Sequence, residues 1–190
     1  MDQKQEKIVA CAIEVFSRYG VRRTTMGDIA ESAGVSRQTL YASYANKEEV
    51  LRAAVTQVSN STIAEIESAW ADLETISSKI DAYLDLAVFH FFDMLRKLPD
   101  AADLISGFRE IGAEELAAAE LEKQNLLAIQ FQPFANKLET HGMTPESMAE
   151  LFQTASTNFK YIAEDRDHLT RLLGSLKQTT MVMLGEAAQA

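Results

Sequence analysis

Apolar residues in the N-terminal part of the chain have the spacing of an amphipathic helix. Over residues 3–19 they recur at positions that fall on one helical face. The residues of this stripe are Ile8, Cys11, Ala12, Val15 and Phe16. Gly20 follows the stripe and is expected to end the helix, because glycine readily takes the left-handed conformation past a helix C-terminus.

Two short helices with clear start signals are expected next. Thr25, with Asp28 three residues later, can cap a helix over residues 26–33. Ser36 can cap a second helix from 37 to about 43.

The rest of the chain favours longer helices. Asn46, with Glu49 three residues later, can cap a helix over 47–73. The further helices are expected over 76–98, about 101–108, 113–141, 146–164 and 166–187. The first of these is apolar nearly all round and is expected to be central and buried, with Pro99 at its end, and Pro133 should kink the third. Because no convincing strand or repeat is found, the sequence predicts an all-α protein of about nine helices.

Residues 25–41 are expected to form a helix-turn-helix unit. Gly34 suits the tight turn between the two helices, and Ala30 is small enough for them to cross closely. The side chains expected to face inward are Ile29, Ala30, Val35, Leu40 and Tyr41. The second helix of such a unit enters the DNA major groove by its N-terminal end. A generic three-helix bundle with polar caps is the alternative interpretation.

The residues at the start of the second helix suit base recognition. Arg37 can pair with guanine through two hydrogen bonds, Gln38 can pair with adenine, and Thr39 can contact a thymine methyl group or a phosphate. Backbone N–H groups at the capped helix starts near Thr25 and Lys47 are expected to point at phosphates.

The charge of the chain is distributed unevenly. The net charge is −10, which argues against DNA binding if it is taken as an average. Residues 1–52 carry eight basic and seven acidic residues, whereas 53–190 carry ten and twenty-one. Arg22 and Arg23 add positive charge beside the predicted unit. This asymmetry is a clue to a polyanion-binding N-terminal part, although acidic residues also simply solvate helix surfaces.

Residues 8–55 resemble the TetR family of bacterial transcriptional repressors. The segments that carry the resemblance are 12–16, 19–20, 24–30, 33–36, 39–41 and 46–51. The resemblance implies a homodimer with a three-helix DNA-binding head and a helical body for effector binding and dimerisation. It also implies phosphate contacts at the start of the helix over 26–33 and at Lys47.

The chain departs from the family pattern after Tyr41, where two bulky residues are usual and Ala42 and Ser43 stand instead. Ser43 replaces a residue that often touches phosphate, and Gln38 stands where glycine is common, so base preference does not carry over. Tyr44 is expected to pack under the recognition helix. The residues predicted to contact DNA are Thr25, Arg37, Gln38, Thr39, Tyr41, Ser43 and Lys47.

The expected domains are a DNA-binding domain over 1–48 and an effector-binding and dimerisation domain over 49–190. Large apolar side chains in the second domain are candidates to line an effector pocket, although such residues more often form plain core. They are Trp70, Phe89, Phe92, Phe108, Phe131 and Phe134. Their character suggests an uncharged, largely apolar effector.

Two apolar stripes near the C-terminus predict half of a four-helix bundle between subunits, as the resemblance also implies. The stripes are Leu151, Phe152, Ala155 and Phe159, followed by Leu169, Leu172, Leu173 and Leu176. The alternative is that both stripes pack only within one chain.

No catalytic constellation, cofactor motif or metal site is expected. His90 lies near Asp93 and Glu164 lies near His168, but each pair lacks a third ligand. Cys11 is expected to be a small core residue, with a redox-sensing thiol as the alternative. No apolar stretch approaches the length of a membrane span, and the N-terminus lacks the layout of a secretion signal, so a cytoplasmic protein without a membrane partner is expected.

The sequence therefore predicts a ligand-responsive transcriptional regulator, and repression is its expected mode of action. It would bind an inverted-repeat operator in double-stranded DNA as a homodimer, and a small, largely apolar effector would release it. Two alternatives remain open. One is a constitutive DNA-binding dimer without an effector, and the other is an all-helical enzyme or carrier with a vestigial head.

Overall fold

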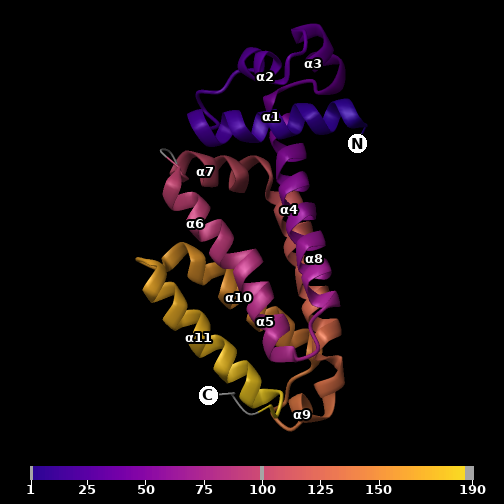
Figure 1. Cartoon of the computed structure of the whole chain (residues 1–190), viewed down its shortest axis with the longest axis vertical. Coiled ribbons are helices and arrows are strands. Elements are labelled where there is room, and N and C mark those ends of the chain that lie inside the picture. The colour runs from indigo at the N-terminus through magenta and orange to yellow at the C-terminus, as the bar shows by residue number, and fades with distance from the viewer. Residues whose placement is uncertain (1, 99–100, 187–190) are drawn as a thin grey trace. The chain divides into compact units, whose positions relative to one another are not determined.

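The computed structural model describes residues 2–98 and 101–186, and within these ranges every regular element is a helix. The α-helices are α1 (Gln3–Tyr19), α2 (Met26–Ala33), α3 (Arg37–Ser43), α4 (Lys47–Ala71), α5 (Ile76–Leu84), α6 (His90–Lys97), α7 (Ala101–Ile111), α8 (Ala113–Phe131), α9 (Ala135–Glu139), α10 (Pro145–Ile162) and α11 (Arg166–Met183) (Figure 1). A π-helical turn, Asp85–Phe89, joins α5 to α6, and a 3₁₀ turn, Gln132–Phe134, joins α8 to α9. The described chain thus forms nine continuous helical stretches, which confirms the all-α prediction.

The predicted helices are present, and their ends differ from the expected ones by a few residues. The helix α11 ends at Met183, and Gly185 follows with a φ of +75°. The predicted end at residue 187 lies outside the described residues. Pro99, expected to end the helix before it, also lies outside them, and α6 ends at Lys97.

Local caps explain why the short helices α2 and α3 form where they do. Oγ1 of Thr25 accepts a hydrogen bond from the N–H of Asp28 at 3.3 Å, and the Asp28 carboxylate accepts one from the N–H of Thr25 at 2.8 Å. Gly34 ends α2 with a φ of +66°, a left-handed conformation that side chains with a β-carbon rarely adopt. Oγ of Ser36 then accepts a hydrogen bond from the N–H of Thr39 at 3.0 Å. Helices of this length need such caps and tertiary packing.

The described chain packs into two compact units. The first unit contains the described residues of Met1–Ser61 and Leu95–Ala119, and the second those of Thr62–Met94 and Glu120–Ala190. The helices α4, α6 and α8 each contain residues of both units. The expected domain boundary at residue 48 separates a DNA-binding part from an effector-binding part. The two units are defined by packing and do not test that boundary, so it stays a prediction.

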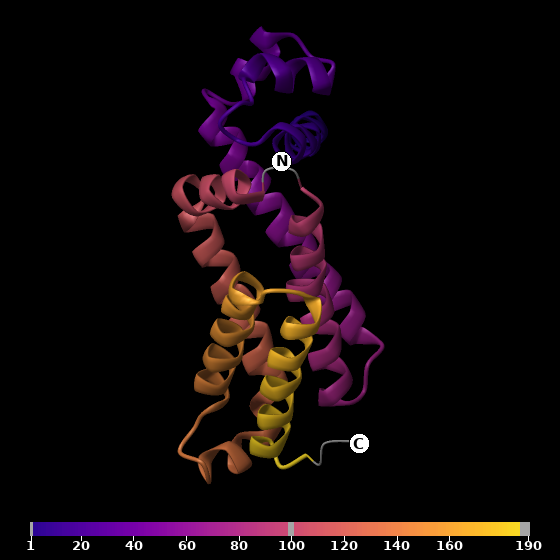
Figure 2. The same cartoon turned by 90° about the vertical axis from the view of Figure 1, so that its left-hand side faces the viewer.

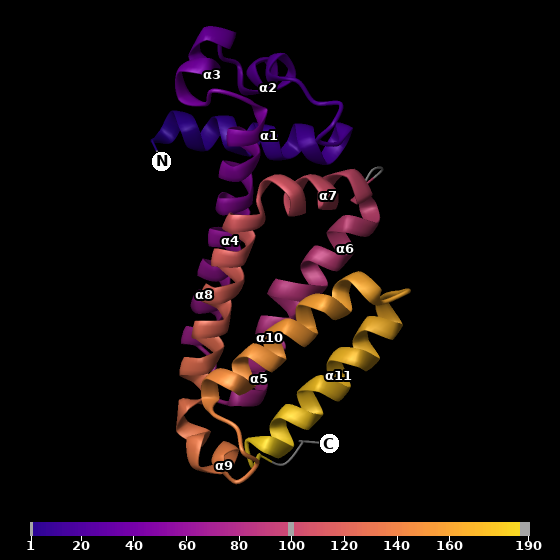
Figure 3. The same cartoon turned by 180° about the vertical axis from the view of Figure 1, so that it is seen from behind.

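The first unit has one core, to which α1, α2, α3, the start of α4 and α7 contribute. Ile29 and Leu40 are completely buried in it, and Leu104 brings α7 into the same cluster. Figure 3 shows α7 beside α1. Tyr44 is buried as predicted, but Tyr41 is 53% exposed. The expectation that Tyr41 packs inward is wrong, because adjacent residues of a helix point in different directions and Leu40 takes the inward one.

The second unit has an aromatic core. The rings of Tyr83 and Phe152 meet edge to face with centroids 6.0 Å apart, and those of Phe131 and Phe152 do so at 6.4 Å. The helices α10 and α11 run antiparallel beside each other in this unit (Figure 2). The helical stretch over 76–98 is buried on one face only, since His90 is exposed and Phe89 is half-buried. The prediction that this helix is central and buried is therefore only partly right.

No helix within the described ranges is both long enough and apolar enough to cross a lipid bilayer.

Candidate nucleic-acid interface

The helix α3 presents its first turn to solvent. Arg37 and Gln38 are exposed, Tyr41 is exposed one turn later, and Leu40 is the buried residue of this seven-residue helix. A single inward side chain therefore anchors α3, while its N-terminal side chains stay available. This is the arrangement that a recognition helix needs.

The Arg37 side chain folds back over the start of α2. A β-carbon on Gly27 would lie only 2.7 Å from Nη2 of Arg37, so the guanidinium covers the first turn of that helix. Hydrogen bonds from the backbone and side chain of Thr25 lower the pKa of Asp28, and the nearby charge of Arg37 adds a smaller effect in the same direction. No hydrogen bond or ion pair of Arg37 is found within the described ranges, so the side chain can swing away toward a base.

The hydroxyl groups of α3 are engaged in local contacts. Oγ1 of Thr39 lies 2.9 Å from Oγ of Ser36, and Oγ of Ser43 donates to the carbonyl of Thr39 at 3.5 Å, a long and weak bond. Thr25 is exposed at the start of α2, where its hydroxyl donates to Asp28 at 2.8 Å. The structure thus brings Thr25, Arg37 and Thr39 to neighbouring helix starts.

Lys47 is held by the loop that precedes α2. Its ammonium group donates to the carbonyls of Val21 at 2.7 Å and Thr24 at 2.9 Å, with a longer contact to Arg22 at 3.4 Å. These three contacts occupy its three donors and fix the loop to the start of α4. Sequence reasoning missed this role, because the partners lie more than twenty residues away. The expected phosphate contact of Lys47 stays a prediction.

The Lys47→Met substitution keeps the aliphatic stem and removes the ammonium group. It is expected to lower the free energy of unfolding by about 1–3 kcal/mol, because partly buried carbonyls lose their charged donor. Chemical denaturation measures this loss, with Lys4→Met at an exposed position of α1 as the matched control. Equal stability of the two variants would contradict the positioning role. The slope of the logarithm of the DNA-binding constant against the logarithm of the salt concentration should also be measured. If its magnitude falls by about one in the Lys47→Met variant, Lys47 contacts a phosphate as well.

Asp103 of α7 fixes the same loop from the other side. Its carboxylate accepts the backbone N–H of Arg22 at 3.0 Å and lies 3.2 Å from Nε of the same arginine. Gly107, one turn further along α7, is close to Val21, since a β-carbon there would lie 2.9 Å from Cγ2 of the valine. Both residues position the loop that carries Arg22 and Arg23, and no signal in the sequence pointed to them.

The Gly107→Ala substitution is expected to destabilise the protein by about 1–2 kcal/mol. Overpacking against Val21 costs roughly 1–3 kcal/mol, and the better helix propensity of alanine offsets part of it. Gly174→Ala is the matched control, because nothing lies within 4 Å of a β-carbon there, and it should stabilise α11 by about 0.5–1 kcal/mol. Thermal unfolding compares the two, and Val21→Ala should restore the Gly107→Ala variant. Stabilisation by both alanines would contradict the close approach at Gly107.

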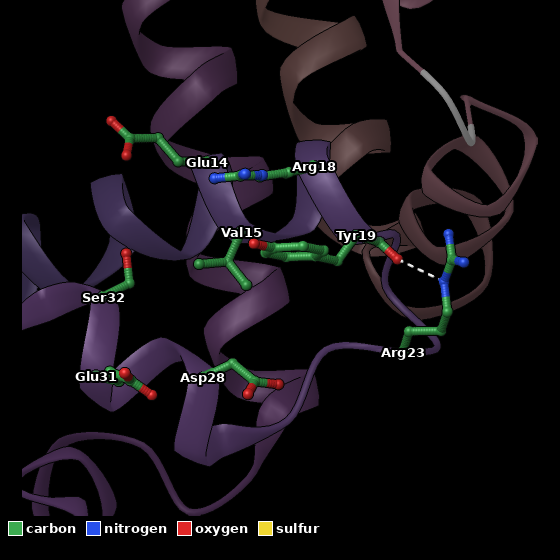
Figure 4. Close-up of a pocket in the computed structure, with 8 residues that line it drawn as sticks. All are labelled: Glu14, Val15, Arg18, Tyr19, Arg23, Asp28, Glu31 and Ser32. Carbon is green, nitrogen blue, oxygen red and sulfur yellow. Dashed lines mark hydrogen bonds between the residues drawn. The ribbon is translucent and has the colours of Figure 1, made fainter.

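A groove of about 660 Å³ lies between α1 and α2 in the first unit (Figure 4). Its lining residues are Glu14, Val15, Arg18, Tyr19, Arg23, Asp28, Glu31 and Ser32. The guanidinium of Arg18 lies 5.2 Å from the centre of the Tyr19 ring, and Nε of Arg23 donates to the Tyr19 carbonyl at 2.9 Å. Three acids and two arginines line the groove, so its charge gives no reason to expect phosphate there.

The residues expected to line an effector pocket fall into two different cores. Trp70, Phe92 and Phe131 are buried in the core of the second unit, and Phe89 and Phe134 pack against it. Phe108 packs against the core of the first unit instead. The structure therefore does not bring Phe108 together with the other five within one core, and the pocket stays a prediction.

Three residues expected at a subunit interface are core residues of the second unit. Phe152, Leu169 and Leu173 are at most 1% exposed, so their assignment to a subunit surface is corrected. They pack inward because α10 and α11 each turn one side of their apolar stripe toward the aromatic core. Leu151 is 48% exposed on the other side of the stripe. The half-buried members are Ala155, Phe159, Leu172 and Leu176.

Within the described ranges, no group of three or more potential metal ligands is found. Asp93 pairs with Arg166 at 3.1 Å, and Nδ1 of His168 lies 3.4 Å from the N–H of Glu164. Cys11 is half-buried and packs against the core of the first unit, as expected for a small core residue.

The capped helix pair and its exposed second helix define a helix-turn-helix protein. Residues 8–54 match the family model described as bacterial regulatory proteins, tetR family. The N-terminal segment of the chain is thus similar to the TetR family, which confirms the resemblance seen in the sequence.

Two relatives agree with this match in the part of the chain that they cover. Over 105 residues the chain is 28% identical to the uncharacterized HTH-type transcriptional regulator YfiR of Bacillus subtilis, covering 55% of this chain and 47% of that protein. Over 51 residues it is 41% identical to the biofilm operon icaADBC HTH-type negative transcriptional regulator IcaR of Staphylococcus epidermidis, covering 27% and 28%. The chain thus spans about half or less of the curated relatives it matches. These relatives are regulators, in agreement with the expectation that the chain is not an enzyme.

A transcriptional regulator from Cytophaga hutchinsonii has a similar fold over nearly the whole chain. Its structure superposes with a TM-score of 0.74 at 20% identity and covers 97% of this chain and 98% of that one. This similarity is one of fold. It extends beyond residue 54, where the match to the family model ends.

Proposed function

We propose that this chain is a transcriptional repressor that binds an inverted-repeat DNA operator as a homodimer and is released by a small molecule. The observation that carries the proposal is the exposed first turn of α3, which lies in the segment matched by the family model. The residues proposed to contact DNA are Thr25, Arg37, Gln38, Thr39, Tyr41, Ser43 and Lys47.

In this proposal α3 lies in the major groove and the start of α2 faces a phosphate. Arg37 leaves its place over Gly27 and pairs with a base, while the first N–H groups of α2 meet the backbone of the DNA. The side chain of Tyr41, which is 53% exposed, contacts the same groove edge. The division of labour is a DNA-binding part up to residue 48 and an effector and dimer part beyond it.

Dimerisation is proposed on the exposed side of α10 and α11. Leu151, Ile162 and Val182 are apolar and 48–63% exposed, and Phe159 and Leu176 are half-buried beside them. Two copies of this helix pair would form a four-helix bundle. Such a dimer explains an inverted repeat, because helix-turn-helix dimers read half-sites about 34–36 Å apart. A protein with this task acts on chromosomal DNA, and so in the cytoplasm.

Repression with release by an effector is proposed for the second unit. The description of IcaR as a negative regulator supports repression, and an aromatic-rich helical unit suits a small, largely apolar effector. An effector that favours a poorly fitting spacing of the two heads would lower operator affinity about 5–150-fold, which corresponds to a coupling of about 1–3 kcal/mol.

Selection of bound sequences from random DNA duplexes tests the proposal with the full chain. The expected result is enrichment of an inverted repeat, with two chains bound to each duplex in sedimentation experiments. Failure to enrich any sequence, or binding of a single chain to one half-site, would contradict the proposed mode of binding.

Arg37→Ala is expected to weaken binding to the selected operator by about 1–3 kcal/mol while leaving binding to scrambled DNA nearly unchanged. Arg37→Lys is the matched variant, because it keeps the charge and loses the paired donors of the guanidinium. It should retain the salt dependence and still lose discrimination between sequences. Titration of labelled duplexes measures both quantities, and full rescue by lysine would assign Arg37 to a phosphate instead of a base.

A further inference from the structure

A group of polar side chains lies within the second unit, between α8 and α10. This buried polar cluster consists of Glu120, Lys123, Gln153 and Thr157. Lys123 is 8% exposed and Gln153 is 3% exposed. Polar groups at such depth are costly unless hydrogen bonds compensate them, so each donor and acceptor of the cluster needs a partner.

The carboxylate of Glu120 is fully engaged. One oxygen accepts a hydrogen bond from the Lys123 ammonium at 2.7 Å. The other accepts hydrogen bonds from the Thr157 hydroxyl at 3.0 Å and from the Gln153 side-chain amide. Burial raises the pKa of Glu120, but the charge and hydrogen bond of Lys123, the charge of Lys160 and the hydrogen bond of Thr157 together hold that pKa below its usual range. The carboxylate is thus charged and needs no further donor.

One acceptor and two donors of the cluster have no partner within the described ranges. Oε1 of Gln153 is buried without a hydrogen bond. The Lys123 ammonium carries three donors, of which the bond to Glu120 uses one. Both side chains end on the same carboxylate, so the free acceptor and the free donors are within reach of one small polar group.

A single hydroxyl group can satisfy both the unpaired acceptor of Gln153 and an unpaired donor of Lys123. Its O–H can donate to Oε1 of Gln153, and its oxygen can accept from Lys123. A phenolic hydroxyl suits the site better than an aliphatic one, because a phenol is the more acidic and a nearby ammonium favours the build-up of negative charge on its oxygen.

The surroundings favour an aromatic ring on the ligand. Tyr83 is 1% exposed, and its pKa is raised by burial and by the charge of Glu120, which places its ring near the cluster. Phe91 lies under the ammonium of Lys160 at 4.8 Å from the ring centre. The π-helical turn Asp85–Phe89 packs against α10 in the same unit, and such turns occur frequently at functional sites.

We propose that Gln153 and Lys123 together bind the hydroxyl group of a phenolic effector. The inference rests on the proposed function, in which the second unit binds a small molecule, and it names the chemical class of that molecule. The ligand remains largely apolar, and its one polar atom fills the gap in the buried polar cluster.

Calorimetric titration of the full chain with 4-butylphenol and 4-butylanisole tests the proposal. The two probes have the same apolar skeleton, and the methyl ether lacks the O–H donor. A site built around a hydroxyl discriminates strongly against an analogue without it, so the phenol is expected to bind at least about tenfold more tightly. Equal affinities, or no binding of the phenol up to its solubility, would overturn the proposal.

Two variants test whether the buried polar cluster causes the preference for the phenol over the methyl ether. Gln153→Met removes the acceptor at nearly constant length, and the preference for the phenol should fall below about twofold. Gln178→Met on the exposed side of α11 is the control and should keep the full preference. Circular dichroism checks that both variants fold. If Gln153→Met does not fold, the comparison of the two probes on the unchanged chain still decides.

Operator binding, measured on the same samples, separates this inference from the proposed function. Specific DNA binding without discrimination between the probes overturns the phenol site alone. Discrimination without specific DNA binding supports the phenol site and contradicts the repressor.

Discussion

Replacing Leu40 with alanine is expected to lower the free energy of unfolding of the first unit by about 2–5 kcal/mol. Leu40 is completely buried and is the side chain that anchors the seven-residue α3 to the core of that unit. A loss of this size is a large share of the stability of a typical domain. Circular dichroism during chemical denaturation measures it, and operator affinity should fall with it.

Tyr41→Phe, one residue along, is the matched control. Its side chain is 53% exposed, so the loss of its hydroxyl should change stability by less than about 0.5 kcal/mol. Any loss of operator affinity in this variant then reports contact with DNA. Similar destabilisation by both substitutions would contradict the orientation of α3 described above.

Replacing Phe152 with alanine is expected to lower the free energy of unfolding of the second unit by about 3–5 kcal/mol. The side chain is completely buried, and its ring meets those of Tyr83 and Phe131 edge to face. Trp70, the only tryptophan of the chain, is buried in the same core, so its fluorescence during denaturation follows this unit.

Leu151→Ala tests the other side of the same helix. Leu151 is 48% exposed, so its truncation should have little effect on the stability of a single chain and should weaken the proposed dimer. Analytical ultracentrifugation measures the second effect. If Phe152→Ala weakened the dimer and left the stability of the chain unchanged, then Phe152 would be an interface residue, contrary to its burial here.

The sequence by itself determined the short helices α2 and α3 of the first unit. The caps at Thr25 and Ser36 act over three residues, and Gly34 ends α2 through its own backbone conformation. Such signals are local and can be read without knowing what packs where. For the same reason Pro133 correctly marked the break between α8 and α9.

Only the tertiary structure decided how distant side chains meet. Asp103 holds Arg22 across 81 residues of chain, and Gln153 reaches Glu120 across 33. An apolar stripe likewise does not say which of its edges faces the core, so Leu151 and Phe152 could not be told apart in advance. Periodicity shows which side chains share a helical face. Burial depends on which helices pack against that face, and contacts between residues far apart in the sequence decide those neighbours.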